Sequence, residues 1–215
     1  LISGSSPDEI AINKMNANLK DFFKNQMEEH SMVLDKCKKT LMDSFLNAVE
    51  ICTEAINKEK KILIFGNGGS ASDAQHIATE LTVRFSKNRQ AIAAISLVTD
   101  TSAITAIGND FGFDFIFSRQ IEAIGLKGDV ALGISTSGKS KNVLNGLTKA
   151  KEMQLKCLAF TGKNITSLSN ICEEIISIPA NNTSRIQEMH ILIGQMICNA
   201  IEYKLGLTSL VKEEK

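Results

Sequence analysis

The sequence predicts an α/β protein in which helices flank a parallel sheet of five strands and an N-terminal helical extension precedes the sheet. After Lys58, five short apolar runs alternate with segments of helical periodicity, which is typical of right-handed βαβ crossovers. Before Lys58, apolar residues recur at intervals of three and four, as on one face of a helix. Two loops rich in Gly and Ser directly follow apolar runs, at the strand ends where parallel sheets bind ligands.

Residues 1–58 are expected to form the helical extension. Ser6 and Pro7 predict a helix start, because a hydroxyl caps free amides and proline at the first position has no amide to satisfy. Phe22, Leu41 and Phe45 belong to the apolar face that follows. This face is expected to pack on the core or on a sister subunit, and the sequence leaves both possibilities open.

Residues 59–210 are expected to form the domain that contains the sheet. The continuous apolar runs predict buried parallel strands, because such strands are covered by helices on both faces. The expected strands are residues 62–65, 92–98, 130–134, 155–160 and 174–178, and a last helix is expected from about Ser184 to Leu205.

Composition narrows the range of functions. The chain has 215 residues, with 24 Lys and Arg against 24 Asp and Glu, so no net charge attracts it to nucleic acid or to an anionic membrane. No apolar run reaches the roughly 18 residues of a membrane span. The five cysteines are widely spaced and form no CxxC pair, which favours reduced thiols and a cytoplasmic protein.

The two Gly- and Ser-rich loops predict a site for a phosphate group. The first expected strand continues into GNGGSA at residues 66–71, and the third continues into STSGKS at residues 135–140. Glycines allow the backbone to approach an anion closely, and hydroxyls and helix amides donate hydrogen bonds to it. Two such loops at neighbouring strand ends favour a phosphomonoester.

Both loops also match other nucleotide-binding patterns. Residues 66–71 fit a dinucleotide fingerprint, but the acid expected about 20 residues later is missing, since Asp100 lies nearer 30 residues on. Residues 133–140 match the spacing of a phosphate-binding loop of nucleotide hydrolases, with Lys139 as its lysine. Asp100 is the sole loose candidate for the accompanying metal ligand, and the first loop would be left without a role.

His76 and Glu80 are expected to lie on one face of the helix that follows the first loop, because they are four residues apart. A carboxylate there can take a proton from a carbon next to a carbonyl group. A histidine and a carboxylate can also hold a divalent metal that polarises the carbonyl. Near a phosphate loop, we interpret the pair as functional rather than as a surface ion pair.

The last predicted helix carries Gln187, His190 and Gln195. Gln187 lies beside His190 on one side and Gln195 on the other, so one substrate meets Gln187 with either neighbour more easily than all three. His190 suits a structural role and a catalytic role equally. His30, in the helical extension, is given no functional role.

These motifs together resemble bacterial phosphoheptose isomerases of the sugar-isomerase (SIS) domain class. The resemblance runs from about Leu41 to Tyr203. It implies a Rossmann-like SIS fold and a homotetramer with active sites between subunits. It also implies conversion of sedoheptulose 7-phosphate to D-glycero-D-manno-heptose 7-phosphate for the heptose of lipopolysaccharide. The motifs that carry it are residues 66–70, 74–76, 80–81, Arg84, 106–110, 117–119, 133–138 and 185–190.

The resemblance also implies roles for single residues. The hydroxyl groups that would hold phosphate are those of Ser70, Ser135, Thr136, Ser137 and Ser140. Further substrate-binding residues would be Asn67, Gly68, Gly69, Arg84, Asn109, Asp110 and Gln187. Zinc would be bound by His76, Glu80, Gln187 and Gln195. Catalytic residues would be Glu80, His190 and Gln195.

One position departs from the family pattern. Members usually carry a histidine, which binds metal and transfers protons, where this chain has Gln195. An amide can coordinate through oxygen but cannot shuttle a proton near neutral pH. The alternative is a catalytically weak SIS protein that binds sugar phosphate and a replication initiator, like the DnaA-initiator-associating protein. That relative typically lacks the carboxylate as well, so Glu80 favours an enzyme.

Overall fold

The computed structural model describes the backbone of residues 7–208 and the side chains of residues 18–208. The expected cap at Ser6 and the last two residues of the expected region 59–210 lie outside these limits. The elements are α1 (Pro7–Thr40), α2 (Met42–Asn57), β1 (Ile62–Gly66), α3 (Gly69–Thr82), β2 (Ala94–Ser96), α4 (Thr101–Asp110), η1 (Phe113–Phe115), α5 (Ser118–Ile124), β3 (Val130–Ser135), α6 (Lys141–Glu152), β4 (Lys156–Thr161), β5 (Glu174–Ser177) and α7 (Thr183–Lys204).

The predicted five-stranded parallel sheet is confirmed. Its strand order is β2-β1-β3-β4-β5, and every neighbouring pair is parallel. The structure has β2 at Ala94–Ser96, which is shorter than the predicted strand at residues 92–98. Ile92 does not pair with a strand, because its backbone amide donates to the Leu81 carbonyl at the end of α3. The order places β1 and β3, which lead into the two predicted phosphate loops, side by side.

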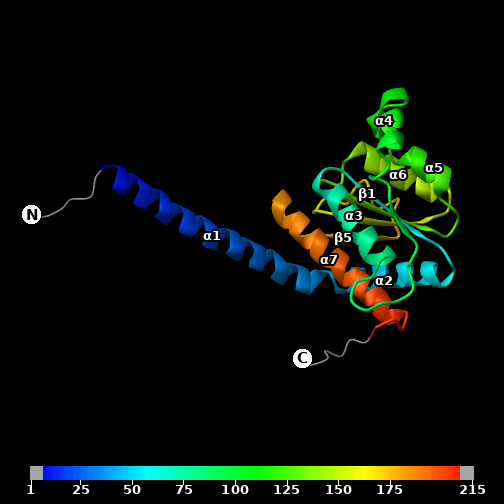
Figure 1. The fold of residues 1–215 in the computed structure, drawn as a ribbon, viewed down its shortest axis with the longest axis horizontal. Coiled ribbons are helices and arrows are strands. Elements are labelled where there is room, and N and C mark those ends of the chain that lie inside the picture. Colours follow the sequence, from blue (N-terminus) through cyan, green and yellow to red (C-terminus); the bar gives the residue numbers. More distant parts are fainter. Residues whose placement is uncertain (1–6, 209–215) are drawn as a thin grey trace, which may run out of the picture.

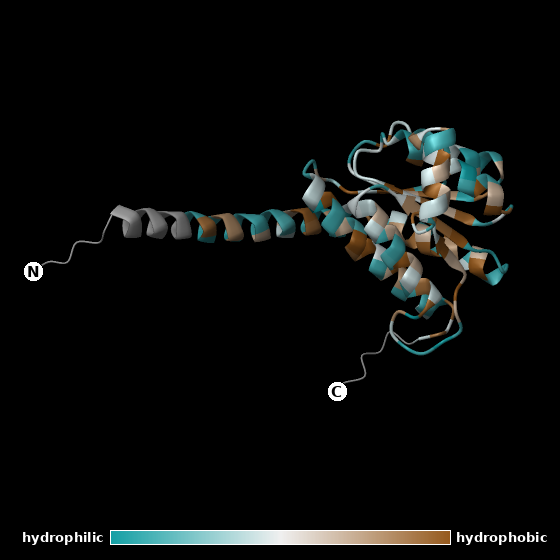
Figure 2. Cartoon of the chain, turned by 45° about the horizontal axis from the view of Figure 1, so that its top comes forward, coloured by the Kyte–Doolittle hydropathy of each residue, from teal (hydrophilic) through white to brown (hydrophobic). Residues whose placement is uncertain are grey.

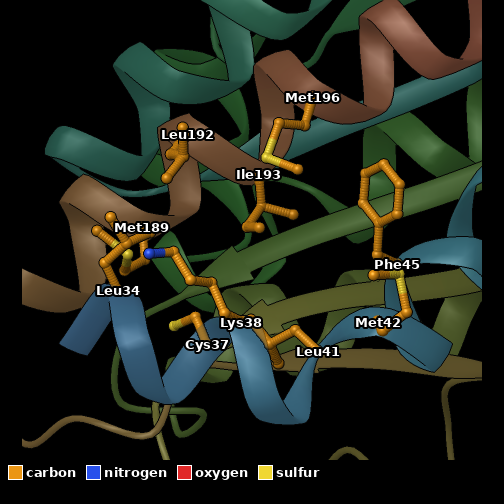
Figure 3. A pocket seen from close by; sticks show the side chains of 10 residues that line it. All are labelled: Leu34, Cys37, Lys38, Leu41, Met42, Phe45, Met189, Leu192, Ile193 and Met196. Carbon is orange, nitrogen blue, oxygen red and sulfur yellow. The ribbon is translucent and has the colours of Figure 1, made fainter. Parts of the chain in front are cut away.

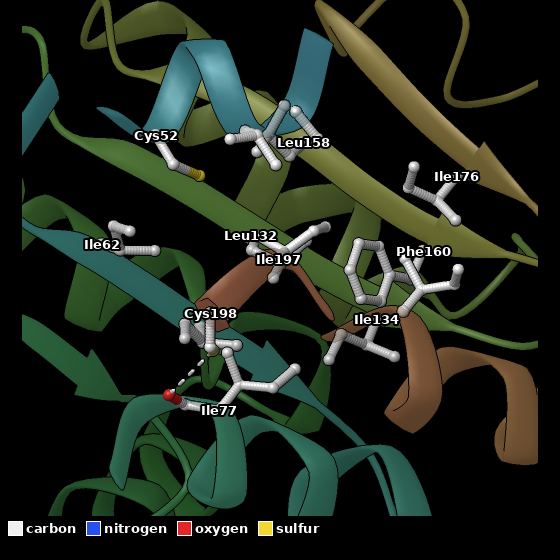
Figure 4. Close-up of a cluster of buried hydrophobic side chains, with 14 of the residues drawn as sticks. Cys52, Ile62, Ile77, Leu132, Ile134, Leu158, Phe160, Ile176, Ile197 and Cys198 are labelled. Atoms are coloured by element: carbon white, nitrogen blue, oxygen red, sulfur yellow. Dashed lines mark hydrogen bonds between the residues drawn. The ribbon is translucent and has the colours of Figure 1, made fainter. Parts of the chain in front are cut away.

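Helices cover both faces of the sheet, with α2, α3 and α7 on one side and α5 and α6 on the other (Figure 1). All five residues of β1 are buried, and they alternate between two cores. Ile62 and Ile64 join the core under α2, α3 and α7, part of which is drawn in Figure 4, whereas Leu63 and Phe65 join the core under α5 and α6. Burial on both faces explains the continuous apolar runs in the sequence.

α1 is one continuous helix of 34 residues that projects away from the sheet (Figure 1). Its last turns pack on α2 and α7, where Val33 and Cys37 are buried. Farther out, apolar side chains such as Phe22 and Phe23 are 60% and 65% exposed, and Figure 2 shows hydrophobic segments along this arm. Within one chain, the arm therefore has an apolar surface that the body does not cover.

All five cysteines are free in the structure, and four of them are buried. Burial raises the pKa of Cys52 to about 12, so this thiol stays protonated at neutral pH. Among the helices of the described residues, none combines the length and the apolar character that a membrane span requires.

Candidate active site

The two predicted phosphate loops lie side by side at the carboxyl edge of the sheet. Gly66 at the end of β1 pairs in register with Ile134 of β3. The side-chain amides of Asn67 and Asn142 exchange two hydrogen bonds of 2.9 Å, which join the first loop to the start of α6. Asn142 is 3% exposed and was not singled out by the sequence analysis. This amide pair fixes the spacing of the loops.

Hydroxyl groups converge in the second loop. The Ser135 Oγ lies 3.0 Å from the Ser140 Oγ and 3.4 Å from the Ser137 Oγ. The Ser137 hydroxyl also accepts a hydrogen bond from the backbone amide of Lys139. Such a cluster of donors with freely rotating protons suits an anion with several acceptor oxygens.

Glycine is required at one point of this loop. Gly138 has a φ of 64°, and a Cβ built there would lie 2.2 Å from the Asn164 carbonyl oxygen. The left-handed backbone and the tight contact together exclude larger residues. The loop therefore has a fixed shape set by its contact with the chain after β4.

His76, Glu80 and Gln195 meet between α3 and α7. The His76 Nε2 lies 3.0 Å from the Glu80 Oε1 and 3.4 Å from the Gln195 Nε2. The side chains of His76 and Glu80 are 45% and 23% exposed, so solutes can reach both. The geometry brings together three of the four residues expected to bind zinc.

Gln187, the fourth expected ligand, lies at the first phosphate loop. A Cβ built on Gly69 would lie 2.4 Å from the Gln187 Nε2, so the amide rests directly against the loop backbone. Gln187 is eight residues before Gln195 on α7, about 12 Å along the helix axis. This position supports the expected contact of Gln187 with the substrate, and its role as a zinc ligand stays a prediction.

His190 is fully buried against the sheet. Its side chain is 0% exposed, its Nε2 lies 3.2 Å from the Thr161 carbonyl oxygen, and its ring lies 5.7 Å from that of Phe160. Burial lowers the pKa of His190 from 6.5 to about 4, so the ring is neutral at pH 7. Of the two roles that the sequence left open, this environment favours the structural one and places His190 away from solutes.

The burial of His190 predicts a loss of stability in acid. Between pH 6.5 and 4 the unfolded chain binds a proton at His190 and the folded chain does not, so the free energy of unfolding falls as the pH falls through this window, by about 3 kcal/mol in total. Denaturant unfolding at pH 7.5 and 5 should show about 2 kcal/mol of this fall, the part that lies above pH 5. His190→Gln should show a smaller fall, because the buried group that binds a proton only in the unfolded chain is absent. An unchanged pH dependence in His190→Gln would contradict the assignment.

Three other expected site residues are exposed and lie outside the cluster. Arg84 follows α3, and Asn109 and Asp110 end α4, a helix with no buried residue whose main contact is with η1. The Asn109 side chain donates a 2.8 Å hydrogen bond to the Asp110 carboxylate. In one chain these groups face solvent.

The structure also accounts for Asp100, on which both nucleotide-binding alternatives depended. Asp100 caps α4, where its side chain accepts a hydrogen bond from the Ala103 amide at 2.9 Å. A capping carboxylate on this edge of the sheet serves the helix.

The arrangement provides an anion-binding pair of loops and, farther along α3, an accessible carboxylate beside an imidazole. Such a combination can bind a phosphorylated molecule at one end and move a proton at the other. Fold and site together define a sugar-isomerase (SIS) domain protein: SIS domain models match residues 26–162 and 123–209.

The chain belongs to the phosphoheptose isomerase family. It is 49% identical over 177 residues to the phosphoheptose isomerase of Campylobacter jejuni, an alignment that covers 82% of this chain and 95% of the relative. The solved phosphoheptose isomerase of Neisseria gonorrhoeae is 38% identical, with a TM-score of 0.81, and the match covers 86% of this chain and 99% of the other. That of Francisella tularensis is 31% identical, with a TM-score of 0.82 and coverages of 85% and 97%.

Proposed function

We propose that this chain is an aldose–ketose isomerase that converts sedoheptulose 7-phosphate to D-glycero-D-manno-heptose 7-phosphate for lipopolysaccharide heptose. The observation that carries the proposal is the placement of Ser70 and Glu80 on one helix, α3. Ser70 is in its first turn at the phosphate loop, and His76 and Glu80 follow by about 9 and 15 Å along the axis. This spacing suits an extended sugar with phosphate at one end and the reacting carbons at the other.

The chain's own residues suffice to describe the steps. The hydroxyls of Ser70 and of residues 135–140 bind the phosphate and fix the substrate's far end. The Glu80 carboxylate takes a proton from C1 of the ketose and returns it to C2, through an enediol, while the hydroxyl proton of O1 passes to O2, so that no external oxidant or reductant is needed. His76, hydrogen-bonded to Glu80, orients the carboxylate.

The residues present fit a divalent metal, and we propose zinc. The His76 Nε2 can either donate to Glu80 or accept from Gln195, but it cannot do both at once, since it has one proton or one lone pair. A cation bound by His76, Glu80 and the Gln195 amide oxygen would satisfy all three groups. Among the described residues no three His, Cys, Asp or Glu side chains form such a group, and the Gln195 amide, which lies 3.4 Å from the His76 Nε2, supplies the third ligand in this proposal. When bound, the metal would polarise the carbonyl group.

We propose that the assembly is a homotetramer with active sites between subunits. The exposed apolar side chains of α1 support this, as does an apolar groove of about 300 Å³ between α1, α2 and α7 (Figure 3). Arg84, Asn109 and Asp110, exposed in one chain, would then reach a neighbour's substrate. Sedimentation equilibrium should give four times the mass of one chain, and Phe22→Glu with Phe23→Glu should give smaller species. A wild-type monomer would contradict the assembly.

Turnover tests the function. Purified protein incubated with sedoheptulose 7-phosphate should form the aldose, followed by NMR, whereas sedoheptulose without phosphate should remain unchanged because it lacks the anchor. Conversion of neither sugar would overturn the proposal.

The replication-initiator alternative is not favoured. The three relatives described above are named phosphoheptose isomerases, and Glu80, the base that an inactive relative would lose, is present and accessible. The five free thiols support a reducing compartment, and we place the reaction in the cytoplasm.

A further inference from the structure

A buried ion pair joins the loop after α3 to the end of α7. The Arg89 Nε donates to the Glu202 Oε1 at 2.7 Å, and the two side chains are 2% and 0% exposed. Arg89 lies nine residues after Glu80, and Glu202 lies in the last turn of α7. Neither residue belongs to the phosphate loops or to the His76 cluster.

The pair binds the backbone of Glu80, an expected site residue, and of Phe85, which follows the expected site residue Arg84. Arg89 Nη2 donates to the Glu80 carbonyl at 2.8 Å, and Nη1 donates to the Leu81 carbonyl at 2.7 Å. The Glu202 Oε1 also accepts from the backbone amide of Phe85 at 2.8 Å, directly after Arg84. The guanidinium thus caps the negative end of α3, whose last carbonyls have no partner within the helix.

The same pair controls how α3 and α7 sit together. Glu202 is seven residues after Gln195 and lies on the same face of α7, two turns away. Gln195 meets His76, and Glu202 reaches Glu80 through Arg89, so the two helices are joined at both ends of the catalytic segment.

Stability does not explain this arrangement. Removing two charges from water costs several kcal/mol per ion, and apolar replacements of a buried pair are often neutral or stabilising. The Glu202 Oε2 has no hydrogen-bond partner and adds a further cost. The planar guanidinium of Arg89, with its several donors in fixed directions, sets a precise backbone geometry, which an apolar pair could not do.

We propose that Arg89 and Glu202 are positioning residues, which hold the Glu80 carboxylate in register with the bound substrate and fix the loop that carries Arg84. This inference rests on the proposed isomerase function. Neither residue touches the substrate; both act through the backbone at residues 80–85.

The test is Arg89→Met with Glu202→Gln, which removes both charges together and keeps an acceptor for the Phe85 amide. We expect kcat to fall about 100-fold, since a displacement of about 1 Å costs this much, while KM changes less than about threefold because the phosphate loops lie at the other end of α3. A change in KM with kcat intact would overturn the proposal.

The matched control is the partly buried pair of Lys61 and Asp129, whose side chains are 18% and 1% exposed and which is joined at 2.5 Å where β1 and β3 begin, at the opposite edge of the sheet. Lys61→Met with Asp129→Asn should lower the melting temperature and leave kcat unchanged. If both double variants lost the same fraction of kcat, the Arg89 pair would be merely structural and the proposal would be wrong.

Two further readouts isolate the effect on Glu80. In a Glu80→Gln background, the Arg89 and Glu202 substitutions should lower the residual kcat less than about threefold, because the carboxylate that they position is absent. An equal fold-loss of kcat with and without the Glu80 carboxylate would overturn the proposal. Hydrogen exchange of amides 79–85, which needs no turnover, should accelerate in the Arg89 variant alone. If the wild type failed to isomerise the sugar, the proposed isomerase function would be wrong, but the hydrogen-exchange result would still test the contact of Arg89 with the backbone. Unchanged hydrogen exchange in the Arg89 variant would show that the pair does not hold residues 80–85 in place.

Discussion

Glu80→Gln is expected to lower kcat by roughly 10²- to 10⁴-fold, the contribution of a general base in a proton-transfer step. The substitution keeps the size of the side chain and a hydrogen bond to His76, but an amide cannot take the proton from C1. KM should change much less, because the phosphate is bound by Ser70 and residues 135–140 rather than by Glu80.

Steady-state turnover of sedoheptulose 7-phosphate measures this effect. Glu54→Gln is the matched control, since Glu54 on α2 forms an exposed i,i+4 pair with Lys58, the residue after that helix, as Glu80 does with His76 on α3. The control should retain full activity. A Glu80→Gln enzyme as fast as the wild type would show that another group is the base.

Gln195→His is expected to raise the affinity for zinc at least about 100-fold, because an imidazole replaces a weak amide ligand beside His76 and Glu80. The Gln195 amide already lies 3.4 Å from the His76 Nε2, so a histidine at this position faces the same point. With zinc bound, the variant should also turn over faster, since it regains a side chain that transfers protons.

Competition with a chelator measures the zinc affinity of both proteins. Met196→His adds a histidine one position along α7, on a different face of the helix, and should leave the affinity unchanged. Equal gains in zinc affinity in the two variants would mean that the metal binds elsewhere. An unchanged zinc affinity in Gln195→His would show that zinc does not bind at His76 and Glu80.

Most of the fold could be predicted from the sequence because the signals are local. β1 reads as a continuous apolar run, since both of its faces are buried. The edge strand β2 was predicted too long, because the apolar character of Ile92 reflects burial against the body rather than pairing. The projecting course of α1 also had no signal, since an amphipathic face does not reveal what covers it.

In the candidate site, too, residues marked by local sequence patterns were predicted and residues defined by long-range contacts were missed. His76 and Glu80 followed from helical spacing, and the phosphate loops followed from glycines and hydroxyls after strands. Asn142, Arg89 and Glu202 were missed, because the side chains that pair with them, Asn67 with Asn142 and Arg89 with Glu202, lie 75 and 113 residues apart in the chain and no local pattern marks such pairs. For His190 the sequence left two roles open, because burial depends on the packing of α7 against β4.

The most direct test of the central claim, that one sugar phosphate extends from the serine loops to Glu80, is a crystal structure of Glu80→Gln with sedoheptulose 7-phosphate. The account predicts the phosphate at Ser70 and residues 135–140, with C1 and C2 within about 3 Å of a polar atom of residue 80. A sugar whose phosphate lay outside these loops, or whose C1 and C2 pointed away from residue 80, would contradict it.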